Sequence, residues 1–163
     1  MYRRWLVAHD FEPCAEAAAD AAARMALACR RDGADSATLF IAHVVTPPAL
    51  PMTSDVGGGV NVLAVIDLMM KTAKERLEAA RAKLTALHPD VKVETVVLSG
   101  SPVEALLDAA DTHRVDAIAV GSHGRTGLAH AFLGSVAERL AQRSPRPVLV
   151  VKQAPEPVLG RAS

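Results

Sequence analysis

Five short apolar runs alternate with longer segments of helical periodicity along the chain. In four of these runs both faces are apolar, which is typical of strands in a parallel sheet that helices cover on both sides. The run at 92–99 alternates between apolar and polar residues, which predicts an edge strand. The predicted strands are 4-RWLVAH-9, 38-TLFIAHVV-45, 92-KVETVVLS-99, 117-AIAVG-121 and 147-PVLVV-151.

Four helices are predicted between these strands. Residues 14–31 are rich in alanine, the strongest helix former. Residues 62–88 carry an apolar stripe with a period of about 3.6 residues, in which Leu68 and Met69 are expected to fill the core. The third and fourth helices begin at 101-SPVE-104 and 135-SVAE-138. In each of them we predict a capping box, with the serine as N-cap and the glutamate as its partner.

Strands that alternate with helices in this way predict an α/β fold. We expect a single domain over residues 1–152, with a doubly wound, open, parallel, five-stranded sheet of Rossmann-like type and helices on both faces. Two segments do not fit the pattern. Residues 46–61 contain three prolines and three consecutive glycines and are predicted to be a flexible loop, and residues 153–163 are predicted to be a frayed tail.

Composition narrows the range of functions. The 163 residues include 18 Lys and Arg and 18 Asp and Glu, so the net charge is zero, which argues against nucleic acid as a partner. No apolar run approaches the length of a membrane span, so a soluble, cytoplasmic protein is expected. Cys14 and Cys29 have a spacing that suits neither a metal site nor a redox pair, and no metal-ligating side chain is predicted.

Candidate binding residues follow three of the predicted strands. In open α/β sheets a ligand lies beyond the carboxyl ends of the strands, where Asp10, Val44 and the loop after residue 120 are expected. In this loop two residues separate Gly121 from Gly124, nine residues separate Gly124 from Gly134, and Ser135 follows directly. The spacing matches neither a GxGxxG dinucleotide motif nor a Walker loop. Glycines here either form a permissive turn or bring backbone N–H groups close to a phosphate.

The pattern G-x2-G-x9-G-S between the fourth strand and fourth helix resembles the nucleotide-binding signature of the universal stress protein family. The resemblance covers nearly the whole chain and includes 8-AHDF-11, 43-HVV-45, 99-SGSPVEAL-106 and 146-RPVLVVK-152. It departs from the family pattern at Ala8, where proline is frequent, and at Ala137, where threonine is frequent. The resemblance implies an ATP site, with Mg2+ bound to the phosphates, and a homodimer that forms through the last strand, 147–151.

The resemblance also implies roles for individual residues. Asp10 would contact the ribose or adenine, the Val44 backbone would read the adenine edge, and Val120 would form the floor of the pocket. The glycines would allow close approach of the backbone, and Ser135 with the Val136 amide would hold phosphates. The sequence itself adds Arg125, the only cation in the loop, which is either a phosphate contact or a solvated loop residue. The complete candidate set is Ala8, Asp10, Val44, Val120, Gly121, His123, Gly124, Arg125, Gly134, Ser135 and Val136.

Some of these residues, and other histidines of the chain, also have a purely structural interpretation. Ser135 alone would only cap a helix, Asp10 could be a turn residue ahead of Pro13, and His43 could be a core histidine. His123 and His130 have no carboxylate neighbour in the sequence, which favours loop histidines bonded to backbone over general acids or bases.

Three functions therefore stay open, and no catalytic residue is predicted for any of them. The leading hypothesis is an ATP-binding module that signals stress or energy status, with at most slow hydrolysis. The alternatives are an enzyme that hydrolyses ATP or transfers an adenylyl group, and a dimeric scaffold that binds no nucleotide.

Overall fold

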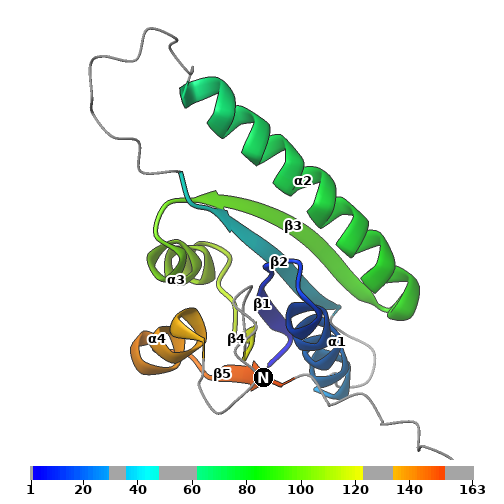
Figure 1. The fold of residues 1–163 in the computed structure, drawn as a ribbon. Helices are drawn as coiled ribbons and strands as arrows, with labels where there is room; N and C mark the ends of the chain where they lie inside the picture. The colour runs from blue at the N-terminus through cyan, green and yellow to red at the C-terminus, as the bar shows by residue number, and fades with distance from the viewer. Residues whose placement is uncertain (1, 30–35, 48–61, 123–133, 153–163) are drawn as a thin grey trace, which may run out of the picture.

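Five parallel strands form one open sheet in the computed structural model, which describes residues 2–29, 36–47, 62–122 and 134–152. The order across the sheet is β3-β2-β1-β4-β5, and every neighbouring pair is parallel (Figure 1). This confirms the predicted α/β fold and the predicted position of β3 at an edge. The strands are β1 (Arg4–Ala8), β2 (Ala37–Val45), β3 (Val91–Ser99), β4 (Ala117–Gly121) and β5 (Val148–Val151). The predicted loop and tail lie outside the described residues, apart from Thr46 and Pro47.

Within the described ranges, four helices cover the sheet, two on each face. Helices α1 (Pro13–Ala28) and α2 (Val62–Leu87) pack on one face, and α3 (Pro102–Thr112) and α4 (Ser135–Arg143) pack on the other (Figure 1). We call these the α1/α2 face and the α3/α4 face. Side chains alternate between them along each strand: Trp5 and Val7 point to the α1/α2 face, and Leu6 points to the α3/α4 face. None of the helices in the described ranges combines the length and the apolar character that a membrane crossing needs.

The winding direction of the chain reverses beside β1. The chain proceeds from β1 outward through β2 to β3, and then crosses to β4 on the other side of β1. The connections that leave β1 and β4 therefore run to opposite faces of the sheet, to α1 and α4. Such a reversal leaves a crevice at the carboxyl ends of the two strands, which is where open α/β sheets bind ligands.

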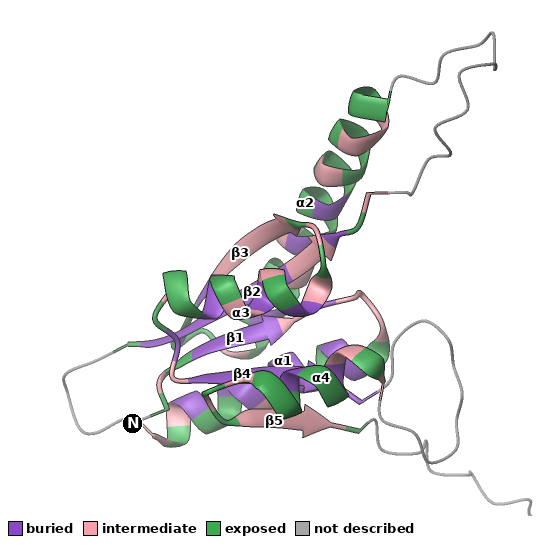
Figure 2. Ribbon diagram, turned by 90° about the vertical axis from the view of Figure 1, so that its left-hand side faces the viewer, coloured by how far each residue is buried: buried purple, intermediate pink, exposed green. Residues whose placement is uncertain are grey.

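Helix α2 is longer than the sheet beneath it. Its 26 residues extend about 39 Å, whereas the 9 residues of β3 extend about 30 Å. Ala73, Leu77 and Leu84 are its buried residues, while Leu68 remains 65% exposed and Met69 37% exposed. The predicted core role of Leu68 and Met69 is therefore wrong, because the N-terminal turns of α2 project past the sheet (Figure 2).

Neither predicted capping box forms. Ser101 is the N-cap residue of α3, but its side chain makes no capping hydrogen bond, and Glu104 instead pairs with Arg143 of α4 at 2.6 Å. In α4 the N-cap is Gly134, and Ser135 is the first helical residue. In α3 the predicted capping box fails because Arg143, a charged partner on the neighbouring helix, outcompetes a neutral backbone N–H for Glu104.

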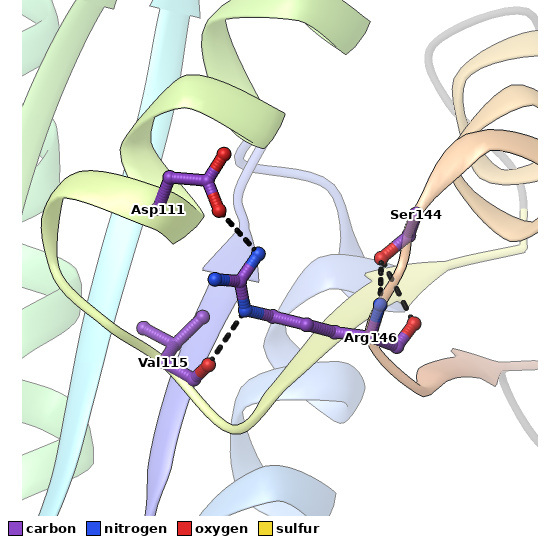
Figure 3. A network of polar contacts seen from close by, with 4 residues as sticks. All are labelled: Asp111, Val115, Ser144 and Arg146. Carbon is purple, nitrogen blue, oxygen red and sulfur yellow. Dashed lines mark hydrogen bonds and ion pairs between the residues drawn. The ribbon is translucent and has the colours of Figure 1, made fainter.

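A polar network fixes the connection from α4 into β5. The Arg146 guanidinium pairs with Asp111 at 2.6 Å and donates to the Val115 carbonyl oxygen at 2.8 Å (Figure 3). The Ser144 hydroxyl accepts from the Arg146 amide at 3.0 Å and donates to the Arg146 carbonyl oxygen at 2.8 Å. This network holds the start of β5 against the end of α3.

Candidate functional site

A cavity of about 630 Å³ opens at the carboxyl ends of β1, β2 and β4, at the point where the winding reverses. This volume lies within the range of small-molecule sites. The structure brings eight of the predicted site residues to its wall, whereas His123, Gly124 and Arg125 lie outside the described residues. The eight are Ala8, Asp10, Val44, Val120, Gly121, Gly134, Ser135 and Val136.

The start of α4 forms one wall of the cavity. The Gly134 amide donates to the Ser122 carbonyl oxygen at 2.8 Å, which ties the beginning of α4 to the end of β4. The first bond within the helix runs from the Glu138 amide to the Gly134 carbonyl oxygen, at 2.9 Å. The N–H groups of residues 135–137 therefore have no acceptor within the helix, and these residues line the cavity. Unpaired N–H groups and the helix dipole make this wall attractive to an anion.

Asp10 follows β1 and turns the chain into α1. Its Oδ1 atom accepts a hydrogen bond from the Glu12 amide at 3.0 Å, so the interpretation of Asp10 as a turn residue is correct. A carboxylate has about four acceptor positions, so this bond leaves capacity for hydroxyl donors from the cavity. The structural role and a binding role are therefore compatible at Asp10.

Gly121 is required for packing. A Cβ atom at this position would lie 2.8 Å from the Cys14 Cβ and 2.9 Å from the Cys14 carbonyl carbon. The residue lacks a side chain because β4 ends directly against the first turn of α1. The structure therefore gives Gly121 a packing role, which is separate from its predicted approach to a ligand.

The α1/α2 side of the cavity contains residues that sequence reasoning missed. His9 is 5% exposed, and its Nδ1 accepts from the Phe11 amide at 3.2 Å. Burial, partly offset by Asp10 and Glu16, lowers the pKa of His9 below its ordinary value. His43 was expected in the core but is half-buried in the cavity wall, with its Nδ1 2.7 Å from the His9 carbonyl oxygen.

Arg76 of α2 completes this side of the cavity. Its guanidinium carbon lies 4.0 Å from the centroid of the Phe11 ring. No sequence motif marks the position, because only the packing of α2 on the sheet brings Arg76 to the rim. Within the described ranges, no group of three or more His, Cys, Asp or Glu side chains is arranged to hold a metal ion.

An open, doubly wound α/β sheet with a cavity at its point of reversal defines a Rossmann-like class of protein. Within this class, the sequence pattern of the universal stress protein family matches residues 1–152, and the chain belongs to that family. The assignment made from the loop spacing and the strand ends is therefore confirmed.

Individual relatives agree with the family assignment. Universal stress protein YxiE of Bacillus subtilis is 34% identical over 155 residues, which cover 93% of this chain and all of that protein. Universal stress protein MJ0577 of Methanocaldococcus jannaschii is 36% identical over 85 residues. That matched segment spans 52% of this chain and about half, 51%, of the relative's length.

Solved structures show the same fold. The structure of MJ0577 matches with a TM-score of 0.74 and 27% identity, over 94% of this chain and 98% of that one. A universal stress protein in complex with cAMP matches with a TM-score of 0.56 and 27% identity, over 94% of this chain and 98% of that one.

Proposed function

We propose that the chain binds an adenine nucleotide, ATP in particular, in the cavity at the carboxyl ends of β1, β2 and β4. The observation that carries the proposal is that two kinds of group share the cavity wall: N–H groups at the start of α4 that have no acceptor within the helix, and the Asp10 carboxylate. The complex of a similar universal stress protein with cAMP supports an adenine nucleotide as the ligand. We treat residues 1–152 as one nucleotide-binding domain.

The phosphates bind at the first turn of α4 in this proposal. The amides of Ser135 and Val136 and the Ser135 hydroxyl donate to phosphate oxygens, and the helix dipole adds to the attraction. Glu138 lies in the same turn and opposes it, so a divalent cation is needed to offset the repulsion of a triphosphate. Mg2+ would then bind to the phosphates themselves, and ATP would carry it into the site.

The ribose and base occupy the α3/α4 side of the cavity. Asp10 accepts from the ribose hydroxyls, which are donors matched to a carboxylate. The base lies against an apolar wall, and the backbone at Val44 offers hydrogen-bonding groups to its edge. The wall consists of Ala8, Val44, Pro102, Leu106 and Val120.

The proposed role is a nucleotide-dependent signalling module with at most slow hydrolysis. Each of the two histidines of the cavity wall contacts a backbone group through its Nδ1 atom, which fixes the orientation of its ring. Binding is therefore the part of the chemistry that the wall supports, and we assign no catalytic residue.

We also propose a homodimer that forms through β5. This strand is an edge of the sheet, and its four side chains are all half-buried. An apolar edge strand with unpaired backbone groups favours association with a second copy of itself.

The nucleotide proposal is tested by mass spectrometry of the small molecules released on denaturing freshly purified protein, together with calorimetric titration of ATP. Ser135→Glu places a negative charge at the phosphate wall and should weaken ATP binding at least about a hundredfold, by repulsion and by steric block. Ala141→Glu adds the same charge to the exposed face of α4 and serves as the matched control. Asp10→Asn retains the acceptor for the Glu12 amide and should weaken binding about tenfold, by loss of the charged acceptor. Equal ATP affinity in the wild type and Ser135→Glu would show that ATP does not bind at this wall.

A further inference from the structure

The cavity has two sides, and the proposed nucleotide uses only one of them. Val7 faces the α1/α2 helices, so His9, two residues later, lies on that face as well. The same alternation places His43 with Ile41 on the α1/α2 face, whereas Ala8 and Val44 belong to the α3/α4 face. The α1/α2 side of the same cavity therefore has lining residues of its own, and Arg76 is the cation among the described residues that line it.

Arg76 has no carboxylate partner among the described residues. The ion pairs of α2 within the described ranges involve Arg81 with Glu78 and Lys83 with Glu16. The positions three and four residues from Arg76 hold Thr72, Ala73, Ala79 and Ala80, so its own helix supplies no acidic neighbour. Among the described residues, the positive charge that Arg76 brings to the cavity therefore forms no ion pair.

The guanidinium of Arg76 is held in place by a strained aromatic platform. Phe11 adopts a φ of 70°, a left-handed conformation that is unfavourable for a bulky residue. Its ring centroid lies 4.4 Å from the centroid of the His43 ring and 4.0 Å from the Arg76 guanidinium carbon, and its amide donates to His9 Nδ1 at 3.2 Å. Backbone strain that the surroundings enforce is frequent at ligand sites. Stacking occupies a face of the guanidinium and leaves the in-plane N–H donors for a ligand.

We propose that Arg76 binds a second phosphate carried on the ribose of the nucleotide, so that the preferred ligand class is adenosine bisphosphates and larger nucleotides that contain them. The inference rests on the proposed function, in which Asp10 contacts the ribose. Phe11 directly follows Asp10, so the residue beneath Arg76 is the neighbour of the ribose contact. In related α/β sites an arginine beside the ribose accommodates a ribose phosphate. A planar guanidinium also suits bidentate binding of phosphate oxygens.

The test compares AMP, adenosine 2′,5′-bisphosphate and adenosine 3′,5′-bisphosphate by calorimetric titration of the full chain. We expect one of the bisphosphates to bind about ten- to hundredfold more tightly than AMP, since hydrogen bonds between charged groups exceed neutral ones. Arg76→Gln should abolish this advantage and change AMP affinity by less than about threefold. Lys74→Gln removes the same charge from the exposed surface of α2, does not line the cavity, and should preserve the advantage.

Two results would overturn the inference. One is that neither bisphosphate binds more tightly than AMP. The other is that Arg76→Gln weakens AMP and the bisphosphates equally, which would place Arg76 at a part of the ligand that they share. Failure of the proposed function is distinguishable, because it would appear as no binding of AMP or ATP by the wild type. Ser135→Glu should weaken all three ligands alike, whereas the effect of Arg76→Gln is selective.

Discussion

The most direct structural prediction concerns Gly121. In Gly121→Ala the new methyl group would lie 2.8 Å from the Cys14 Cβ, 2.9 Å from the Cys14 carbonyl carbon and 3.1 Å from the Ala15 nitrogen. Two of these three atoms are backbone of α1, so no side-chain rotation relieves the overlap. Overpacking of this kind costs about 1–3 kcal/mol. The lower entropy of the unfolded alanine chain offsets about 0.4–1 kcal/mol of that cost.

Contacts under 3.0 Å that include a backbone atom place the overlap in the upper half of its range, about 2–3 kcal/mol, so the net destabilisation of Gly121→Ala is about 1–2.6 kcal/mol. For a chain of this length it corresponds to a decrease of about 2–10 °C in the unfolding midpoint. The assay is thermal unfolding followed by circular dichroism, with urea unfolding as an independent measure of the free energy.

Comparing alanine with serine at the same position distinguishes steric overlap of the new side chain from strain in the backbone. Gly121→Ser should be less stable than Gly121→Ala, because its hydroxyl adds to the overlap. At Gly100 the φ is 118° and an added Cβ meets no atom within 4 Å, so Gly100→Ala and Gly100→Ser should lose similar stability through the backbone alone. An unfolding midpoint for Gly121→Ala within about 1 °C of the wild type would refute the steric argument.

Three further predictions concern other parts of the molecule. In urea unfolding, Arg146→Met should lower the free energy of unfolding by about 1–3 kcal/mol, because it leaves the Val115 carbonyl without its side-chain donor. The control Arg81→Met breaks only an exposed ion pair with Glu78 and should lower the free energy of unfolding by under about 1 kcal/mol. His9 has a lowered pKa, so the unfolded chain takes up a proton more readily than the folded one. The contribution of neutral His9 to the free energy of unfolding should then be fully present above about pH 6.5 and be lost as the pH decreases below it. In urea unfolding at pH 5–7, His9→Asn should reduce the dependence of the free energy of unfolding on pH. An equal pH dependence in both proteins would contradict this prediction. At β5 the carbonyl oxygens of Pro147 and Val151 accept hydrogen bonds from the amides of Ile118 and Ser122, so the Val150 amide points to the open edge of the sheet. Val150→Pro removes that edge donor and should convert the proposed dimer to a folded monomer in analytical ultracentrifugation. An unchanged mass would exclude this edge as the dimer interface.

The sequence alone determined the fold because the signals that specify it are local and repeated. Short runs that are apolar on both faces, such as 117–121, are typical of strands that helices cover on both sides of a sheet, and their alternation with helical segments leaves few topologies. The same order places Asp10, Val44 and the start of α4 at one rim, since all strands of a parallel sheet point the same way. The candidate residues on the α3/α4 side could therefore be named before any coordinates were known.

Tertiary structure alone decided the features that depend on contacts between distant segments. The packing of α2 on β2 and β3 brings Arg76 over Phe11, 65 positions away in the chain, and no local pattern encodes this proximity. The failure of the capping box at Ser101 has the same origin, because Arg143 of another helix claims Glu104. A glycine at position 121 fits both a permissive turn and a backbone that binds phosphate, and only the close approach of α1 shows that packing requires it. Periodicity reports which face of an element is apolar, and long-range packing determines what that face meets.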